Sequence, residues 1–243
     1  MVQFEETVEQ RYRGEQGREY HVGKRSIPEC AYPWVASLRA RKIQPHVAAT
    51  DTVLEYGVGT GWNLADLRCG RKIGVDLAEH VEPLLRRQGI EFLSSTAGMA
   101  AGTIDVCICH HTLEHAPHPP HILAEAARLL RPGGTLLLFV PFEIERRYRR
   151  YDPGEPNHHL YSWNVQSLGN LVGDAGFSIL QAGIGEFGYD RFAAVLAARY
   201  RLGGLGFRLI RKAVHLLRPG REVRLVARKE AAVPNPLEQT RRA

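Results

Sequence analysis

The sequence predicts an α/β fold with a doubly wound, seven-stranded, mostly parallel sheet. From position 51 onward, short apolar runs alternate with helical stretches of roughly ten residues, which is the pattern of successive βαβ units. A glycine-rich turn, Gly57–Gly61, follows the first apolar run, and an acidic residue, Asp76, ends the second. Glycines at such a turn let the backbone approach a ligand, and ligands of open α/β sheets bind at the carboxyl ends of the strands.

Residues 1–48 are predicted to form an N-terminal helical extension, or lid, ahead of the main domain at 49–230. Polar residues interrupted by glycines come first, and a helix with apolar positions on one face is expected over 29–42. Three side chains of this extension are candidates for covering a ligand: Tyr12, Tyr20 and His21.

The main domain alternates strands with helices, and its strands are apolar throughout because helices cover both faces of the sheet. Strands are expected at 52–56, 72–76, 90–93, 104–109, 135–140, 177–181 and 222–227. Helices are expected at 61–68, 78–88, 118–130 and 163–175, the third beginning at prolines and ending before a Pro-Gly-Gly sequence.

A helical insertion, 185–220, separates the last two strands, and residues 231–243 read as a flexible tail. The residue pattern of the insertion favours a helix that packs on the domain and exposes a basic face to solvent. An acceptor-binding cap and a membrane-surface contact are the alternatives, the latter because the helix is basic and amphipathic. One helical face holds Phe207, Ile210, Val214 and Leu217, whereas Arg208, Arg211, Lys212, His215 and Arg218 fall elsewhere.

Composition places the chain among globular, intracellular proteins. Of 243 residues, 44% are hydrophobic and 24% are charged, and no apolar run reaches the ~20 residues that span a bilayer. The four cysteines lack the density of a disulfide framework, and the charged N-terminal stretch does not resemble a secretory signal, so we expect a cytoplasmic protein with free thiols. The net charge of +6 suits an anionic partner but is weak evidence for nucleic acid.

The glycine turn and Asp76 together indicate a nucleoside-containing cofactor, because a carboxylate there can accept hydrogen bonds from ribose hydroxyls. A dinucleotide-binding motif is the competing interpretation. That motif places Gly or Ala at its sixth position, where this chain has Trp62. An acidic residue two positions before the first glycine, Glu55, also favours a methyltransferase.

Five segments in order along the chain resemble the class I S-adenosylmethionine-dependent methyltransferases, over roughly residues 50–182 and the last strand. They are 53–61, 73–76, 111–115, 128–134 and 175–177. The resemblance implies a Rossmann-like methyltransferase fold with S-adenosylmethionine as cofactor and S-adenosylhomocysteine as product.

The resemblance also implies which residues bind the cofactor. Glu55 and the turn with Gly57, Gly59, Thr60 and Gly61 would surround the methionine portion. Asp76 would hold the ribose and Leu77 would pack on adenine. Members of the family usually carry an Asp after the third strand, but this chain has Ser94–Met99 there, so Ser95 or a backbone carbonyl would contact the adenine amino group. His110, at the end of the fourth strand, completes the candidate set.

Candidate catalytic residues follow the fourth strand: His111, Glu114 and His115, with a distal His158 or His159. Three roles are open for them. The Glu-His pair can orient the backbone and close the cofactor pocket. The cluster can hold a divalent metal, as in some small-RNA and ubiquinone-pathway O-methyltransferases, and its imidazoles favour Mn²⁺, Fe²⁺ or Zn²⁺ over Mg²⁺. A histidine can also act directly as general base.

The chain is therefore predicted to methylate a small, anionic metabolite, with oxygen as the favoured acceptor atom. The arginine-rich stretch 143–151 could clamp a phosphate or carboxylate, although a solvated charged loop explains it equally. An RNA methyltransferase and a non-catalytic cofactor-binding scaffold are the alternatives. Neither an RNA-binding module nor a transmembrane segment is visible in the sequence, and the identity of the acceptor and the oligomeric state are left open.

Overall fold

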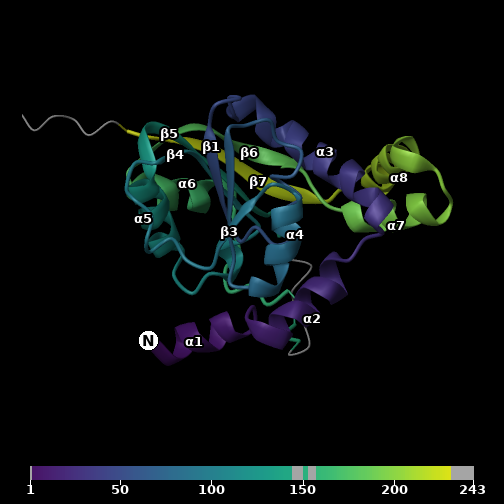
Figure 1. Cartoon of the computed structure of the whole chain (residues 1–243), viewed down its shortest axis with the longest axis horizontal. Helices are drawn as coiled ribbons and strands as arrows, with labels where there is room; N and C mark the ends of the chain where they lie inside the picture. The colour runs from purple at the N-terminus through teal and green to yellow at the C-terminus, as the bar shows by residue number, and fades with distance from the viewer. Residues whose placement is uncertain (1, 144–149, 153–156, 231–243) are drawn as a thin grey trace, which may run out of the picture.

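Seven strands form one mixed sheet in the order β3-β2-β1-β4-β5-β7-β6 (Figure 1). The structure is a computed structural model, and it describes residues 2–143, 150–152 and 157–230. The first five strands pair in parallel, whereas β7 runs antiparallel to both β5 and β6. The strands are β1 (Thr52–Tyr56), β2 (Arg71–Val75), β3 (Glu91–Leu93), β4 (Ile104–His110), β5 (Leu130–Pro141), β6 (Phe177–Glu186) and β7 (Arg221–Lys229). The predicted doubly wound α/β fold is confirmed.

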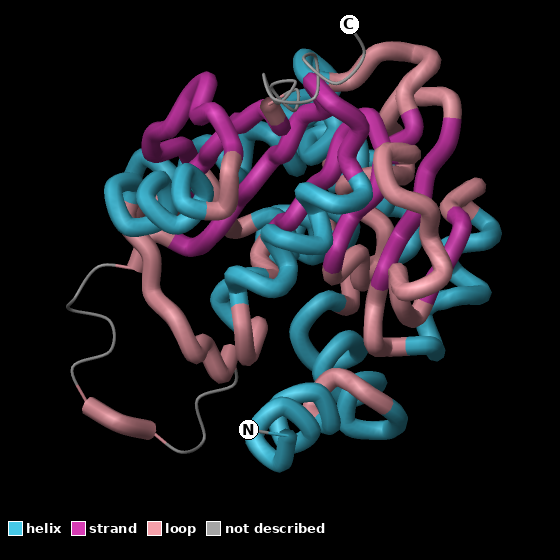
Figure 2. The backbone as a smooth tube through the Cα atoms, turned by 90° about the vertical axis from the view of Figure 1, so that its left-hand side faces the viewer, coloured by secondary structure: helices cyan, strands magenta, loops and turns pink. Residues whose placement is uncertain are grey.

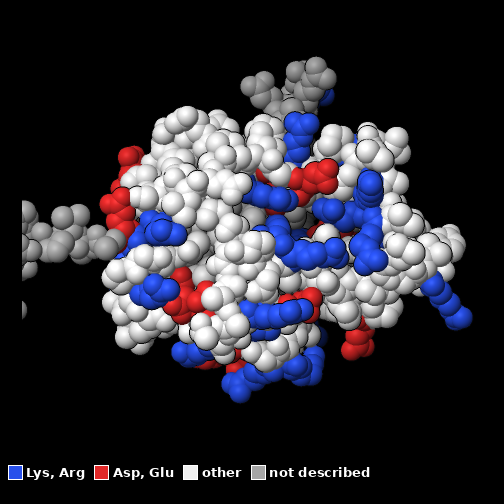
Figure 3. Space-filling view, turned by 90° about the horizontal axis from the view of Figure 1, so that it is seen from above, with Lys and Arg blue, Asp and Glu red and all other residues white. Residues whose placement is uncertain are grey.

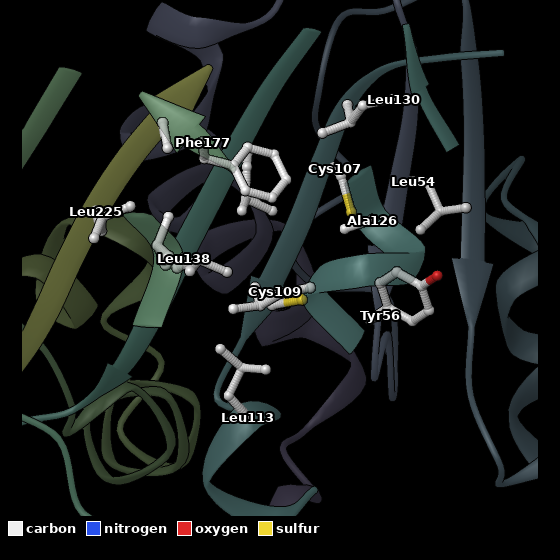
Figure 4. Close-up of a cluster of buried hydrophobic side chains, with 14 of the residues drawn as sticks. Leu54, Tyr56, Cys107, Cys109, Leu113, Ala126, Leu130, Leu138, Phe177 and Leu225 are labelled. Atoms are coloured by element: carbon white, nitrogen blue, oxygen red, sulfur yellow. The ribbon is translucent and has the colours of Figure 1, made fainter. Parts of the chain in front are cut away.

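Helices cover both faces of the sheet because alternate residues of the central strands point to opposite sides. The helices are α1 (Val2–Gln10), α2 (Gly14–Arg25), α3 (Tyr32–Ile43), α4 (Glu82–Arg87), α5 (Pro119–Leu129), α6 (Val165–Asp174), α7 (Asp190–Arg199) and α8 (Gly203–Leu217). Residues of α5 and α6 belong to the same buried cluster as Leu54 and Cys107, part of which is shown in Figure 4. Residues of α3 and α4 pack on the neighbouring positions, Val53 and Val106, from the other face.

The predicted helix at 61–68 is wrong, because residues 62–66 form hydrogen-bonded turns. Trp62, Asn63 and Leu64 are all buried. Three consecutive side chains cannot share one face of a helix, so burying all of them requires a tighter, irregular path. The Asn63 amide also donates a hydrogen bond to the buried carboxylate of Glu55, which holds this segment against β1.

The insertion contains two helices, α7 and α8, which are joined by a short turn and pack on each other. The predicted burial of α8 is partly wrong. Phe207 is buried as expected, but Leu217 is exposed and His215 is buried. His215 Nε2 donates a hydrogen bond to the Gly188 carbonyl at 3.1 Å, which pairs one of the two ring nitrogens of this buried residue within the insertion.

Candidate functional site

A cavity of about 440 Å³ lies at the carboxyl ends of β1, β2 and β4, where ligands of doubly wound sheets bind. Loops after four strands and helix α1 form its wall. The lining residues used below are Gly57, Gly59, Asp76, Leu77, Ser94, Ser95, Thr96, His111, Thr112, His115, Glu5 and Val8 from α1, and Tyr12 from the turn that follows α1.

The glycine turn adopts a backbone that only glycine takes without strain. Gly57 has φ +66° and Gly59 has φ +51°. The amide of Gly57 donates to the carbonyl of Val75 at 2.8 Å, which ties the turn to the end of β2. A Cβ at Gly57 would collide with the side chain of Thr112. The turn therefore presents bare backbone to the cavity.

Asp76 lies beside this turn, at the end of β2. Its Oδ2 accepts the amide of Gly59 at 2.7 Å, and its Oδ1 accepts the amide of Ala78 at 2.9 Å. Each carboxylate oxygen has two lone pairs, so both can also accept a hydroxyl from a ligand in the cavity. Two backbone donors thus fix the orientation of the carboxylate.

The loop after β3 is held from α5 rather than by a carboxylate of its own. Glu125 accepts the hydroxyl of Thr96 at 2.8 Å, and Arg128 donates to the Met99 carbonyl at 2.7 Å. Ser95 Oγ accepts the amide of Ala97 at 3.2 Å. Ser95 therefore lies on the cavity wall in a loop whose backbone is already ordered.

Helix α1 covers the cavity from the N-terminal extension. The Tyr12 hydroxyl is 3.0 Å from His115 Nδ1, and Glu5 Oε1 is 2.7 Å from His118 Nε2. Both views of the backbone place α1 and α2 at one end of the sheet (Figure 1, Figure 2). Tyr20 and His21 belong to α2, and their side chains lie outside the described residues.

The predicted cofactor residues divide into two groups. Gly57, Gly59, Asp76, Leu77 and Ser95 line the cavity. The rest lie outside its lining: Glu55, Thr60, Gly61 and His110.

Each residue outside the lining has protein neighbours instead. Glu55 is buried against Asn63, and a Cβ at Gly61 would meet Leu85 and Ile90 rather than the cavity. His110 is buried behind His111, where it accepts a hydrogen bond from Lys42 Nζ at 2.8 Å. Glu55 and Gly61 therefore support the glycine turn from the side that faces the protein interior rather than the cavity.

The predicted catalytic residues form two separate clusters. Glu114, His115 and His159 have ligand atoms within 4.8 Å of one another, so they could hold a metal ion. The prediction of His158 as the distal member is not supported, because the adjacent His159 occupies that place and donates from Nδ1 to Glu143 Oε1 at 2.7 Å. In the other cluster, His111 joins His110 and Glu222.

His111 lies between the two clusters. Its Nε2 is 3.3 Å from Glu222 Oε2, and its Nδ1 is 3.5 Å from Glu114 Oε1. Burial lowers the pKa of His111 to about 4, although the hydrogen bond to Glu222 opposes this shift. The imidazole is therefore neutral near pH 7.

A second cavity, of about 430 Å³, opens beyond His111, between α3 and the α7–α8 insertion. Figure 3 shows Lys and Arg side chains gathered around a hollow on this side of the molecule, with acidic atoms between them. Phe187 lines this cavity, and its ring centroid is 4.0 Å from that of His111, which lines the first. We call it the cationic cavity, after five lining side chains: Arg39, Arg41, Lys42, Arg211 and Arg224.

Two buried carboxylates lie among these cations. Asp190 pairs with Arg39 at 2.7 Å and with Arg211 at 2.8 Å. Glu222 pairs with Lys42 and with Arg224, each at 2.8 Å. Asp190 and Glu222 thus pair with four of the five cations, whereas Arg41 and the carboxylate of Glu186 also line the cavity, so five basic side chains face three carboxylates.

Burial and the neighbouring side chains change the proton affinities of both partners of the Lys42–Glu222 pair. Burial, assisted by the neighbouring guanidinium groups, lowers the pKa of Lys42 to about 7, although Glu222 opposes the shift. Burial would raise the pKa of Glu222, but the hydrogen bond with His111 and the Lys42 ammonium lower it to about 2.

Sequence reasoning missed Lys42 and Glu222. The sequence signal for Glu222 was an acidic residue next to the apolar run of β7. The signal for Lys42 was a basic cluster near the end of α3. Neither signal shows that the two residues meet. The arginine-rich stretch proposed as a phosphate clamp lies largely outside the described residues, at 144–149. The cationic cavity has a different origin, in α3, α8 and the strands around it.

The fold and the first cavity define an α/β protein that binds a nucleoside-containing cofactor at the carboxyl ends of its strands. The sequence profile of the family described as "methyltransferase domain" matches residues 32–182, more than half of the chain. The chain belongs to the S-adenosylmethionine-dependent methyltransferases, and S-adenosylmethionine is the cofactor of this family.

Curated relatives agree with this family over part of their length. A probable S-adenosylmethionine-dependent methyltransferase of Mycolicibacterium smegmatis is 30% identical, over 55% of this chain and 54% of the relative. A ubiquinone biosynthesis O-methyltransferase of Xanthomonas oryzae is 35% identical, over 35% of this chain and 41% of the relative. The chain thus spans only about half the length of the curated relatives it matches.

Solved structures share the fold at low sequence identity. A putative methyltransferase from Bacillus halodurans has a TM-score of 0.60 at 17% identity, covering 80% of this chain and 100% of its own. The [4+2]-cyclase SpnF has a TM-score of 0.56 at 19% identity, covering 81% and 80%. Because one of these proteins is a cyclase, the fold alone does not define the reaction. Within the described ranges, no helix combines the length and apolarity needed to cross a membrane.

Proposed function

We propose that the chain transfers a methyl group from S-adenosylmethionine to a hydroxyl oxygen of a small metabolite that carries a phosphate or carboxylate. One observation carries the proposal: His111 lines the cofactor cavity and also contacts Phe187 of the cationic cavity. The two cavities therefore approach each other at these two rings, and an acceptor in the cationic cavity that moves the Phe187 ring aside would reach the cofactor cavity at His111.

The first cavity fits S-adenosylmethionine. Its wall combines bare glycine backbone, the oriented carboxylate of Asp76 and the apolar side chain of Leu77. These groups suit, respectively, the close approach of an amino-acid portion, ribose hydroxyls and an adenine face. When bound there, S-adenosylmethionine supplies an electrophilic methyl group.

The cationic cavity fits an anionic group on the acceptor. Arginine side chains bind phosphate and carboxylate oxygens through paired N–H donors, and Arg41 and Arg224 both line this cavity. An incoming anion would offset the positive charge that the two buried carboxylates leave uncompensated. It would also favour the ammonium form of Lys42.

His111 is placed to accept the proton that an acceptor hydroxyl loses. Neutral His111 donates its Nε2 proton to Glu222, which leaves Nδ1 as the atom that can take a proton. Glu114 Oε1, 3.5 Å from Nδ1, would stabilise the resulting imidazolium. Positioned general bases typically contribute a factor of about 10²–10⁴ to the rate, and the low pKa of His111 places its contribution toward the lower end of this range.

The cluster of Glu114, His115 and His159 is a second component of the proposal, as a site for a divalent metal. His159 Nδ1 donates a hydrogen bond to Glu143, which leaves His159 Nε2 as the ligating atom. The Tyr12 hydroxyl contacts His115 Nδ1, which likewise leaves His115 Nε2 as the ligating atom. Two imidazoles and one carboxylate suit Mn²⁺, Fe²⁺ or Zn²⁺, and such an ion would act as a Lewis acid toward the acceptor oxygen. Titration with Mn²⁺ should show binding that His159→Ala weakens and His158→Ala does not.

The experiment that tests the proposal is an acceptor screen with purified protein and S-adenosylmethionine. Hydroxylated carboxylates and phosphate monoesters are compared with uncharged analogues of the same skeleton, and S-adenosylhomocysteine formation is measured. We expect turnover of anionic acceptors, with KM raised about tenfold or more in Arg41→Gln because one charged hydrogen bond is lost.

Arg71→Gln is the matched control, because the exposed Arg71 pairs with Glu91 at the start of β2. Equal kcat/KM for charged and uncharged acceptors would contradict an anion-binding role for the cavity. Turnover of RNA alone, with an affinity that falls steeply with salt, would replace the metabolite by a nucleic acid.

A further inference from the structure

Helix α8 presents a row of leucines that no other described part of the chain covers. Leu205, Leu209 and Leu216 are 61%, 59% and 78% exposed. Their spacing of four and seven positions places them on one face of the helix. The opposite side of α8 is already used, because Phe207 packs against Trp34 and His215 donates a hydrogen bond to Gly188.

Exposed apolar side chains continue into α7 and the turn that joins the two helices. Phe192, Val195, Tyr200 and Leu202 are all exposed. In the space-filling view, the part of the molecule where Figure 1 places α7 and α8 is mostly white, with blue Lys and Arg side chains beside it (Figure 3). Leucine side chains this exposed are ordinary when scattered, but a concentration on one pair of helices indicates a binding surface.

The same segment is strongly basic. Residues 191–221 contain eight Lys and Arg side chains and no Asp or Glu. Arg211 points inward to Asp190, whereas Arg208 and Lys212 are exposed and lie three or four positions from the leucines of the row. The surface therefore combines apolar side chains with adjacent positive charge.

We propose that this α7–α8 face binds the surface of an anionic lipid bilayer. The leucines would enter the boundary between headgroups and acyl chains, and Arg208 and Lys212 would contact lipid phosphates, as for amphipathic helices that lie in the plane of a membrane. A second copy of the chain is a poorer occupant. Pairing this face with itself would bring Arg208 and Lys212 of both copies together with no acidic residue from 191–221 to offset them.

The test is flotation of the full chain with vesicles of phosphatidylcholine alone, or with about one third phosphatidylglycerol. We expect flotation with the anionic vesicles and little with the neutral ones. The double variant Leu209→Ser, Leu216→Ser should bind at least about tenfold more weakly, because two apolar side chains no longer enter the membrane. Arg208→Gln, Lys212→Gln should lose the preference for phosphatidylglycerol.

Leu180→Ser is the matched control, because Leu180 is an exposed leucine on β6, away from the α7–α8 face. Binding of S-adenosylhomocysteine and the thermal midpoint establish that each variant is folded. The proposal fails if the folded wild-type chain stays with the unbound fraction. It also fails if Leu180→Ser loses flotation equally, or if the chain is a dimer that Leu209→Ser, Leu216→Ser dissociates while vesicles remain unbound.

Discussion

Replacing Lys42 with methionine should change how the stability of the chain depends on pH. Lys42 Nζ lies 2.8 Å from Glu222, and its side chain is only 15% exposed. Burial lowers the pKa of Lys42 from 10.5 to about 7 in the folded chain. Between these two values the folded state has released the Lys42 proton while the unfolded state retains it. Because the unfolded state then binds more protons, the free energy of unfolding rises with pH.

The size of this effect follows from the two pKa values. Between pH 6 and pH 9, a lysine with a pKa of about 7 when folded and 10.5 when unfolded adds about 2.5 kcal/mol to the free energy of unfolding. Lys42→Met lacks this titration, so the difference in stability between wild type and variant should change by that amount. Added inorganic phosphate should stabilise the wild type more at pH 6 than at pH 9 if the anion binds beside the Lys42 ammonium.

The assay is urea unfolding followed by tryptophan fluorescence at several pH values, with Lys212→Met as a control at an exposed position. The control should follow the wild type at every pH. A difference between wild type and Lys42→Met that stays constant from pH 6 to pH 9 would refute the reasoning. It would mean that Lys42 keeps its proton as readily in the folded chain as in the unfolded one.

Three other substitutions test the cofactor cavity and the buried ion pair. Asp76→Ala should weaken S-adenosylhomocysteine binding by roughly 1–3 kcal/mol in a calorimetric titration, with Asp76→Asn intermediate, and an unchanged affinity would mean that the carboxylate does not contact the ribose. Gly57→Ala should lower the thermal midpoint, because its φ of +66° and the side chain of Thr112 leave no room for a Cβ, whereas Gly98→Ala, with open space around it, should not. Glu222→Gln should cost about 3–5 kcal/mol in urea unfolding at pH 6 but less at pH 9, where Lys42 is neutral, and an equal cost at both pH values would show that the two charges do not depend on each other.

Local signals in the sequence were sufficient for the strands and for the cofactor turn. β1 has the predicted bounds, and the glycines after it have the positive φ values that make glycine necessary there. The segment 61–68 was mispredicted because its apolar residues are compatible with a short helix, while the burial of Asn63 against Glu55 depends on contacts that no periodicity reveals.

The cationic cavity could not be predicted because its residues meet only through tertiary structure. Lys42 and Glu222 are separated by 180 positions, and their contact depends on β7 lying beside β5 with Glu222 opposite Pro141. The distinction between His158 and His159 is equally non-local. Adjacent loop residues point in different directions, and the hydrogen bonds from the Leu160 amide to the Glu114 carbonyl and from His159 to Glu143 decide which histidine joins Glu114.

The position of β7 has a consequence for how the protein matures. This strand comes last among the described elements, yet it inserts between β5 and β6 and supplies Glu222 to His111 and Lys42. The glycine turn and Asp76, by contrast, belong to the first third of the chain. A nascent chain could therefore assemble the cofactor-binding half well before His111, the proposed proton acceptor, acquires its partner Glu222. The contact between Glu222 and His111 would form only when β7 pairs with β5 and β6. Detachment of β7 would break this contact while leaving the glycine turn and Asp76 in place.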